Sequence, residues 1–325
     1  MRIVFMGTPE FSVPSLEALL RSDDRIVGVV TQPDRPKGRG QELTSSPIKA
    51  LALRHKLPLL QPLKMKDPAF LDTLRAWRPE LIAVAAFGRI LPKIILEMPP
   101  KGCINVHGSL LPKYRGAAPI QWAIIKGEKE TGITTMLMDE GMDTGAVLLQ
   151  ERIAIEPDDT AGSLSSKLAA VGGRLLTETL TRWKAGTLTP RAQDNSQATL
   201  APILKKEDGL LDWTLPAQTI ADLVRGLAPW PGAYTYANGE RWALWRVSPT
   251  DQASGTMRPG TVVAAHKGAL LVAAGDRLVA VTEVQPANGR RMSVDQYLSG
   301  HPLPSGLRLG AAPEASAATS RLGQN

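Results

Sequence analysis

The first half of the chain alternates strand-length apolar runs with segments in which apolar residues recur at helical spacing. The runs have the composition of buried strands and lie at residues 2–7, 26–33, 81–87, 102–106 and 132–138. The helical segments lie at residues 14–22, 45–56, 69–79 and 119–127. This alternation predicts an α/β domain with a doubly wound, parallel, Rossmann-like sheet, whose site lies beyond the carboxyl ends of the strands.

The second half has a different pattern, typical of antiparallel strands. Residues 232–247 ("GAYTYANGERWALWRV") place Asn238-Gly239 between two strand-like runs, which is the strongest short-range signal for a β-hairpin. Residues 268–286 predict a second hairpin that turns at Gly275-Asp276. We therefore predict a smaller antiparallel β-barrel of OB-like form in the carboxyl-terminal part.

A length of 325 residues also favours two domains, because one hydrophobic core seldom organises so long a chain. The change of pattern predicts a catalytic domain over residues 1–188 and a barrel over residues 209–307. Residues 189–208 have the composition of a linker, and residues 308–325 are small and polar enough for a flexible tail.

Composition narrows the class of protein. Hydrophobic residues make up 43% and charged residues 21%, which is ordinary for a globular protein. The single cysteine, Cys103, excludes an internal disulfide and a Cys-rich metal site, and fits a reducing compartment. No apolar run approaches the roughly 20 residues that a membrane span needs. We expect a cytoplasmic monomer with no membrane contact.

Charge is concentrated in one stretch. Residues 35–66 carry eight basic residues and one acidic residue, whereas residues 205–325 carry twelve basic and ten acidic ones. A basic patch attracts polyanions, but a solvated surface of Lys-rich helix ends gives the same count, so charge alone leaves both interpretations open. Residues 31–47 ("TQPDRPKGRGQELTSSP") contain Gly and Pro breakers without periodicity, and so long a loop is usually functional or disordered.

The strongest chemical signal lies where the run "GCINV" meets "HGSLLP". Asn105 and His107 are two residues apart, so on a strand their side chains point to the same face. Of the four histidines, only His107 lies at the mouth of a core strand. Asp139 and Asp143, in the downstream segment "MDEGMDTG", are the carboxylates that could orient its imidazole.

Three other chemistries fit these residues less well. Ser109 lacks the surrounding elbow of a hydrolase nucleophile. Cys103 shares the face of His107, but its depth in the strand favours a packing role. One His and two Asp have no recognised metal-ligand spacing, so we expect no metal. Acyl transfer between two bound substrates remains, with an amide stabilising the oxyanion and a carboxylate-braced His handling protons.

These motifs resemble the folate-dependent formyltransferase family. The resemblance is carried by "NVHGSLLPKYRGAAPIQ" and "DEGMDTG", and it extends through "MGTPEFSVPSLEALL", "AAFGRILP", "GLLDW" and "APWPG" over roughly residues 1–300. The Gly-rich basic loop and the second domain narrow it to members that act on tRNA. The resemblance implies 10-formyltetrahydrofolate as the formyl donor and the amino group of methionyl initiator tRNA as the acceptor, in support of translation initiation.

The resemblance also implies roles for individual residues. Asn105 would polarise the formyl oxygen, His107 would assist proton movement or stabilise charge, and Asp143 would orient His107. The expected folate-pocket residues are Arg89, Ile90, Leu91, Ser109, Leu110, Leu111, Pro112, Asp139 and Gly141. The expected tRNA contacts are Lys37 and Arg39 in the loop 34–46, together with Lys205, Lys206, Arg290 and Arg291 in the second domain.

Two alternatives remain open from the sequence. A formyltransferase that acts on a small amine would keep the Asn-x-His…Asp pattern but would not need the loop that carries Lys37 and Arg39. An RNA-binding protein on a degenerate scaffold would not need Asn105, His107 and Asp143 together, and the presence of all three counts against it.

Overall fold

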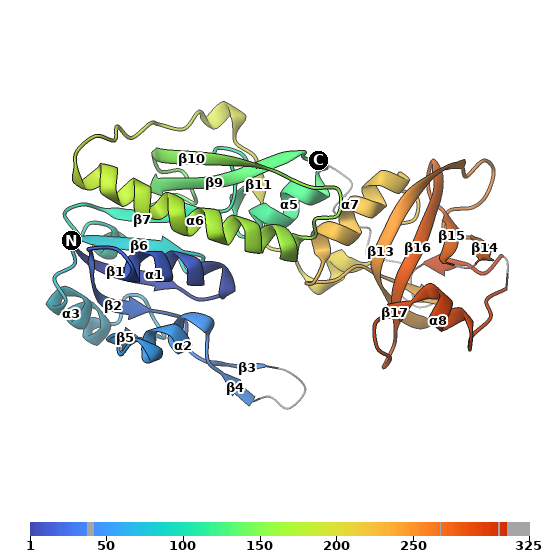
Figure 1. Ribbon diagram of the computed structural model, residues 1–325, viewed down its shortest axis with the longest axis horizontal. Helices are drawn as coiled ribbons and strands as arrows, with labels where there is room; N and C mark the ends of the chain where they lie inside the picture. The colour runs from blue at the N-terminus through green and yellow to red at the C-terminus, as the bar shows by residue number, and fades with distance from the viewer. Residues whose placement is uncertain (38–41, 267, 305, 311–325) are drawn as a thin grey trace. The chain divides into compact units, whose positions relative to one another are not determined.

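The computed structural model describes residues 1–37, 42–266, 268–304 and 306–310, and its contacts divide the chain into two compact units (Figure 1). The first unit comprises Met1–Pro119, Glu130–Ala154 and Leu164–Pro202. The second comprises Ile120–Lys129, Ile155–Ser163 and the chain from Ile203 onward. The units interleave along the chain, so they do not coincide with the contiguous bounds expected from the sequence.

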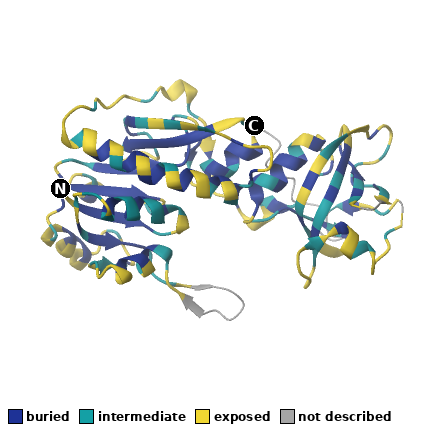
Figure 2. Ribbon diagram, viewed as in Figure 1, coloured by how far each residue is buried: buried dark blue, intermediate teal, exposed yellow. Residues whose placement is uncertain are grey.

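The first unit is built on a seven-stranded sheet in the order β10-β9-β7-β6-β1-β2-β5. Its strands are β1 (Arg2–Gly7), β2 (Arg25–Val30), β5 (Leu59–Leu60), β6 (Leu81–Ala85), β7 (Cys103–His107), β9 (Glu130–Leu137) and β10 (Val147–Ala154). The five neighbouring strands β7, β6, β1, β2 and β5 are parallel to one another, which confirms the predicted class of fold. Figure 2 shows the central strands as buried.

Two strands depart from the expected parallel direction. β9 runs antiparallel to β7, with Leu137 opposite Ile104 and Thr134 opposite His107, and β10 runs antiparallel to β9. The predicted class of fold is confirmed, with an antiparallel edge that the sequence pattern did not indicate. A run of buried apolar residues reports that a segment is a strand, but it carries no information on the strand's direction.

The predicted helices are present, with bounds shifted by a few residues. The α-helices are α1 (Val13–Leu20), α2 (Pro47–Arg54), α3 (Pro68–Ala76), α4 (Lys93–Leu96), α5 (Pro119–Ile125), α6 (Ala161–Lys184), α7 (Ala217–Leu227) and α8 (Val294–Leu298). Short 3₁₀ turns are η1 (Glu10–Ser12), η2 (Asn195–Gln197) and η3 (Lys206–Gly209). Ser46 and Asp67 cap α2 and α3, each accepting a hydrogen bond from a first-turn backbone N–H and preceding a Pro. None of the helices in the described ranges is long and apolar enough to cross a membrane.

The segment expected to be an irregular loop contains a small ribbon, formed by β3 (Arg35–Lys37) and β4 (Glu42–Thr44) paired antiparallel. Strands of three residues with Gly and Pro nearby show no detectable alternation, so the sequence pattern missed them. At the base of the ribbon, Asp34 accepts hydrogen bonds from Lys49 and Gln61. The backbone of Lys37 lies in β3, its side chain is outside the description, and Arg39 lies outside the described residues.

The second unit contains an antiparallel sheet in the order β14-β15-β16-β13-β12-β18. Its strands are β12 (Tyr234–Ala237), β13 (Glu240–Ala253), β14 (Val262–His266), β15 (Ala269–Ala273), β16 (Arg277–Pro286), β17 (Met292–Ser293, paired with β16) and β18 (Leu309–Gly310). Both predicted hairpins are confirmed. Asn238 and Gly239 have φ of 50° and 81°, the left-handed pair that a two-residue type I′ turn requires.

Backbone hydrogen bonds join the two ends of this sheet. The N–H of Val262 donates to Leu307 at 2.8 Å, and the N–H of Leu309 donates to Gly260 at 2.8 Å. The sheet therefore curls into a barrel. Residues 308–310 take part in this closure, so assigning them to a flexible tail was wrong: Arg308 pairs with Thr261, and Leu309 and Gly310 form β18 beside β12. Residues 311–325 lie outside the described residues.

Candidate active site

The carboxyl end of β7 places Asn105 and His107 on one face of the first unit's sheet. Their exposed fractions are 9% and 5%. The carboxamide of Asn105 makes no hydrogen bond to any residue that the structure describes, and its polar atoms are not among the fully enclosed ones, so they reach solvent and are open to a bound substrate. A carbonyl oxygen of a bound substrate would supply the missing partner.

The imidazole of His107 lies between two hydrogen-bond acceptors. Its Nε2 is 3.0 Å from the backbone carbonyl oxygen of Tyr114, and its Nδ1 is 3.6 Å from Oδ2 of Asp143. A carbonyl and an ionised carboxylate can only accept. Nε2 is therefore the nitrogen that donates, to Tyr114, and Nδ1 faces the Asp143 carboxylate beyond hydrogen-bond distance.

Asp143 reaches His107 because the loop between β9 and β10 folds back along β7. The carboxyl end of β9 lies beside Ile104, at the far end of β7 from His107. Asp143 has a φ of 54° in this loop, and its Oδ2 accepts a hydrogen bond from the N–H of Gly116 at 2.9 Å. A Cβ at Gly145 would lie 1.7 Å from the carbonyl oxygen of Leu137, so the return path needs glycine there.

Asp139, the other candidate carboxylate, has a different position. Its Oδ1 accepts hydrogen bonds from the N–H of Gly141 at 3.0 Å and from the hydroxyl of Thr144 at 2.7 Å. Asp139 therefore shapes the loop, whereas Asp143 faces the imidazole.

The segment 89–91 follows β6 at the same edge of the sheet as His107. The guanidinium of Arg89 donates to the carbonyl oxygen of Leu63 at 2.7 Å. Ile90 is 84% exposed, and Leu91 is buried in the core of the unit. Of these three expected folate-pocket residues, Ile90 presents its side chain to solvent and Leu91 does not.

The segment 109–112 is held from within the protein. The carbonyl oxygens of Ser109, Leu110 and Leu111 accept from the Thr134 hydroxyl, the Lys113 N–H and the Gln150 amide. The Ser109 hydroxyl donates to the carbonyl of Lys113 at 2.6 Å, consistent with its exclusion as a nucleophile. Leu111 packs in a small core cluster, and it precedes Pro112 in a cis peptide bond.

Cys103 lies deep in the same strand. Burial raises the pKa of its thiol to about 12, and the sulfur lies 3.7 Å from the carbonyl oxygen of Ile95. A thiol with such a pKa is protonated at neutral pH and is a poor nucleophile. The packing role expected for Cys103 is supported by this environment.

Three residues that the sequence analysis left without a role also belong to this site. Arg115 is buried, and its guanidinium donates to Gln193, a residue of the expected linker. Thr199, from the same stretch, accepts a hydrogen bond from the N–H of Tyr114. Sequence spacing carried no signal for these contacts, because they join segments about 80 residues apart.

The expected tRNA contacts of the second unit are exposed basic side chains. Lys205, Lys206 and Arg290 lie on its surface. Arg291 pairs with Glu283, and its guanidinium lies 4.8 Å from the ring centroid of Trp245.

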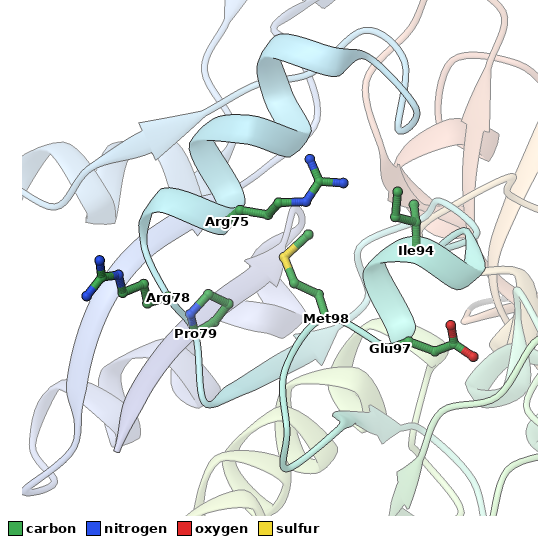
Figure 3. Close-up of a pocket in the computed structure, with 6 residues that line it drawn as sticks. All are labelled: Arg75, Arg78, Pro79, Ile94, Glu97 and Met98. Atoms are coloured by element: carbon green, nitrogen blue, oxygen red, sulfur yellow. The ribbon is translucent and has the colours of Figure 1, made fainter.

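A surface hollow of about 480 Å³ lies away from this chemistry (Figure 3). It is lined by Arg75, Arg78, Pro79, Ile94, Glu97 and Met98. Pro79 and Met98 precede β6 and β7, so the hollow lies at the amino ends of the strands, opposite His107. Among the described residues, no group of three or more His, Cys, Asp or Glu could hold a metal ion.

Comparison with known proteins identifies the family. A family model described as "Formyl transferase" matches residues 1–180, and one described as "Formyl transferase, C-terminal domain" matches residues 203–302. The chain is 51% identical to a methionyl-tRNA formyltransferase of Trichlorobacter lovleyi, over 95% of this chain and 96% of that protein. It is 50% identical to a methionyl-tRNA formyltransferase of Acetivibrio thermocellus, over 95% of this chain and all of that protein.

Solved structures share the fold at lower identity. HypX from Aquifex aeolicus, in complex with tetrahydrofolic acid, aligns with a TM-score of 0.60 at 18% identity, over 92% of this chain and 47% of that one. An N-formyltransferase from Helicobacter canadensis, in complex with folinic acid and dTDP-3-aminofucose, aligns with a TM-score of 0.64 at 18% identity. The alignment covers 86% of this chain and 98% of that one. With both domains matched and relatives near 50% identity over almost the whole length, the chain belongs to the formyltransferase family, on the branch of the methionyl-tRNA formyltransferases.

Proposed function

We propose that this protein transfers the formyl group of 10-formyltetrahydrofolate to the α-amino group of methionyl initiator tRNA, for translation initiation in the cytoplasm. The observation that carries the proposal is the pairing, on one face of β7, of the Asn105 amide, which is open to a bound substrate, with the imidazole of His107, which a carboxylate faces. The curated relatives at about 50% identity carry the acceptor assignment.

In this reaction the amine attacks the formyl carbon, the bond from that carbon to N10 of the folate breaks, and one proton passes from the amine to N10. The formyl oxygen gains negative charge on the way. The carboxamide N–H of Asn105 is the donor for that oxygen, and preorganised donors of this kind are worth about 10²–10³ in rate.

His107 assists proton movement at the same place. Its Nε2 is held by the Tyr114 carbonyl, and Asp143 orients the ring by facing Nδ1. The imidazole assists the passage of the proton from the attacking amine to N10, and any positive charge that it carries during this passage stabilises the oxyanion.

The remaining contacts are part of the same proposal. Arg89, Ile90 and Leu91, the segment Ser109–Pro112, and the loop of Asp139 and Gly141 line the folate pocket. Lys37 and Arg39 contact the acceptor end of the tRNA, and Lys205, Lys206, Arg290 and Arg291 contact its phosphates. The protein acts as a monomer.

Single-turnover transfer from radiolabelled 10-formyltetrahydrofolate to methionyl-tRNA tests the proposal. We expect Asn105→Ala and His107→Asn to lower the transfer rate about 10²-fold or more. His55→Asn is the matched control, because His55 is exposed at the end of α2, and it should leave the rate unchanged.

Lys37→Ala/Arg39→Ala separates recognition from chemistry. We expect this double variant to need more tRNA for saturation while keeping the wild-type rate at saturation. A panel of amino sugars and other small amines runs in parallel. Transfer to a small amine but not to tRNA would overturn the acceptor, and no transfer to any acceptor would overturn the reaction.

A further inference from the structure

The stretch expected to be a linker packs along the first unit. We call residues 191–202 the connecting segment. At its start, Arg191 and Val147 exchange backbone hydrogen bonds of 2.9 and 2.8 Å. Near its end, β11 (Leu200–Ala201) pairs in parallel with β8 (Arg115–Gly116). The segment is therefore anchored on both sides of the residues between them.

Within the segment, Gln193 holds the backbone of the Asp143 loop. Its amide N–H₂ donates to the carbonyl oxygens of Asp143, at 2.8 Å, and Gly145, at 2.7 Å. Its amide oxygen accepts two hydrogen bonds from the guanidinium of Arg115, at 3.0 and 2.8 Å. Arg115 is only 7% exposed and donates a further bond to Asn195 at 2.8 Å. All four hydrogen bonds of the Gln193 amide thus hold the Asp143 loop against Arg115.

Thr199 holds the other partner of the imidazole. Its hydroxyl accepts a hydrogen bond from the N–H of Tyr114 at 2.9 Å, and its carbonyl oxygen accepts one from the N–H of Arg115 at 2.8 Å. The carbonyl of Tyr114 is the group that faces Nε2 of His107. The two acceptors around His107 are therefore each fixed by one residue of the connecting segment.

The backbone at both acceptors needs such support. Asp143 and Tyr114 have φ of 54° and 62°, a left-handed backbone conformation that residues other than glycine seldom adopt. A backbone of this kind persists where surrounding contacts hold it in place. Contacts from Gln193 and Thr199 are placed to do so.

We propose that Gln193 and Thr199 are positioning residues, and that the connecting segment completes the active site by fixing the Asp143 carboxylate and the Tyr114 carbonyl around His107. This inference rests on the proposed catalytic role of His107. A displacement of about 1 Å of a catalytic group can lower the rate about 10²-fold, so contacts at this distance from the chemistry matter.

The variants are chosen to keep the fold. Gln193→Glu retains the oxygen that Arg115 needs but removes the N–H donors to Asp143 and Gly145. Thr199→Val keeps the shape and removes the hydroxyl, and Thr199→Ser restores it. Asp194→Ala is the control, because Asp194 caps η2 within the same segment and its side chain bonds to Ser196 and Gln197.

Two measurements test the inference. In single-turnover transfer to methionyl-tRNA, we expect Gln193→Glu and Thr199→Val to lower the rate about 10- to 100-fold at an unchanged KM for tRNA. Thr199→Ser and Asp194→Ala should keep the wild-type rate, and the midpoint of thermal unfolding is recorded for every variant. A rate loss that Asp194→Ala shares, or that Thr199→Ser does not rescue, would overturn the positioning role.

The second measurement needs no substrate. The ring ¹⁵N resonances of His107, assigned by their loss in His107→Asn, report its protonation and hydrogen bonds in the resting protein. We expect both Gln193→Glu and Thr199→Val to shift them and Asp194→Ala to leave them in place. Unshifted resonances would overturn the inference. If the wild-type protein fails to formylate tRNA, the proposed function is wrong, while the resonances still decide whether the segment positions His107.

Discussion

Nδ1 of His107 lies 3.6 Å from Oδ2 of Asp143, although the two residues come from the end of one strand and from a loop that begins at the opposite end of its neighbour. The separation is longer than a hydrogen bond, so the carboxylate lies beside the ring without a direct hydrogen bond to it. The antiparallel direction of β9 makes the returning loop necessary, and the loop makes the pair possible.

We expect Asp143→Asn to lower the single-turnover rate of formyl transfer about 10²-fold or more, because it removes the negative charge that faces Nδ1 of His107 and orients the ring. Asp72→Asn is the control, because Asp72 pairs with Arg75 on the exposed side of α3, and its rate should stay at the wild-type level. Equal losses in the two variants would contradict the assignment of Asp143.

Gly145→Ala should disable the site through the backbone. Its Cβ would meet the carbonyl oxygen of Leu137 at 1.7 Å, and a backbone atom in a sheet cannot give way. We expect a loss of about 1–3 kcal/mol in the free energy of unfolding, together with a fall in transfer rate. Gly300→Ala has open space and should be close to neutral in both measurements.

Asp34→Asn should loosen the base of the ribbon. Hydrogen bonds from Lys49 and Gln61 lower the pKa of the Asp34 carboxyl. Because the folded pKa lies below the unfolded one, the contribution to stability is present above about pH 4 and is lost as the pH falls further. We expect Asp34→Asn to lower the unfolding temperature at pH 7, to lower it less as the pH falls below about 4, and to raise the KM for tRNA several-fold. Asp72→Asn, which breaks the exposed pair with Arg75, should leave that KM unchanged.

The thiol of Cys103 should stay protonated and unreactive at neutral pH in the folded protein. Its pKa is raised to about 12 by burial, whereas an unfolded thiol titrates near about 8.5. Above that pH the unfolded state loses its proton first, so folding stability falls as the pH rises, by about 1.4 kcal/mol per pH unit for this group.

Chemical unfolding at pH 8 and pH 10 tests this sign. Cys103→Ala should lose less stability between the two pH values than wild type, with the difference assigned to the thiol. A disulfide reagent at pH 8 should modify wild type only after unfolding. Rapid reaction of the folded protein would show that the thiol is accessible.

Patterns of neighbouring residues were enough to predict many of the strands, helices and turns of the fold. The run Arg2–Gly7, the Pro and caps of α2 and α3, and Asn238-Gly239 each act over a few residues, so the structure confirms them. The ribbon at 35–44 and the pairing of residues 308–310 were missed, since strands of two or three residues have no measurable period. The antiparallel direction of β9 was also missed, because the pattern of apolar residues in a buried strand is the same for either direction of the strand.

The amino-acid sequence by itself determined the chemistry of the candidate site: Asn105 and His107 share a face because strand side chains alternate, and Asp143 lies in a glycine-flanked loop. Only the tertiary structure decided which carboxylate faces the imidazole, and that the expected linker holds both of its partners through Gln193 and Thr199. Periodicity is a property of neighbouring residues. Contacts between residues tens of positions apart depend on strand direction and loop path, which the folded backbone alone specifies.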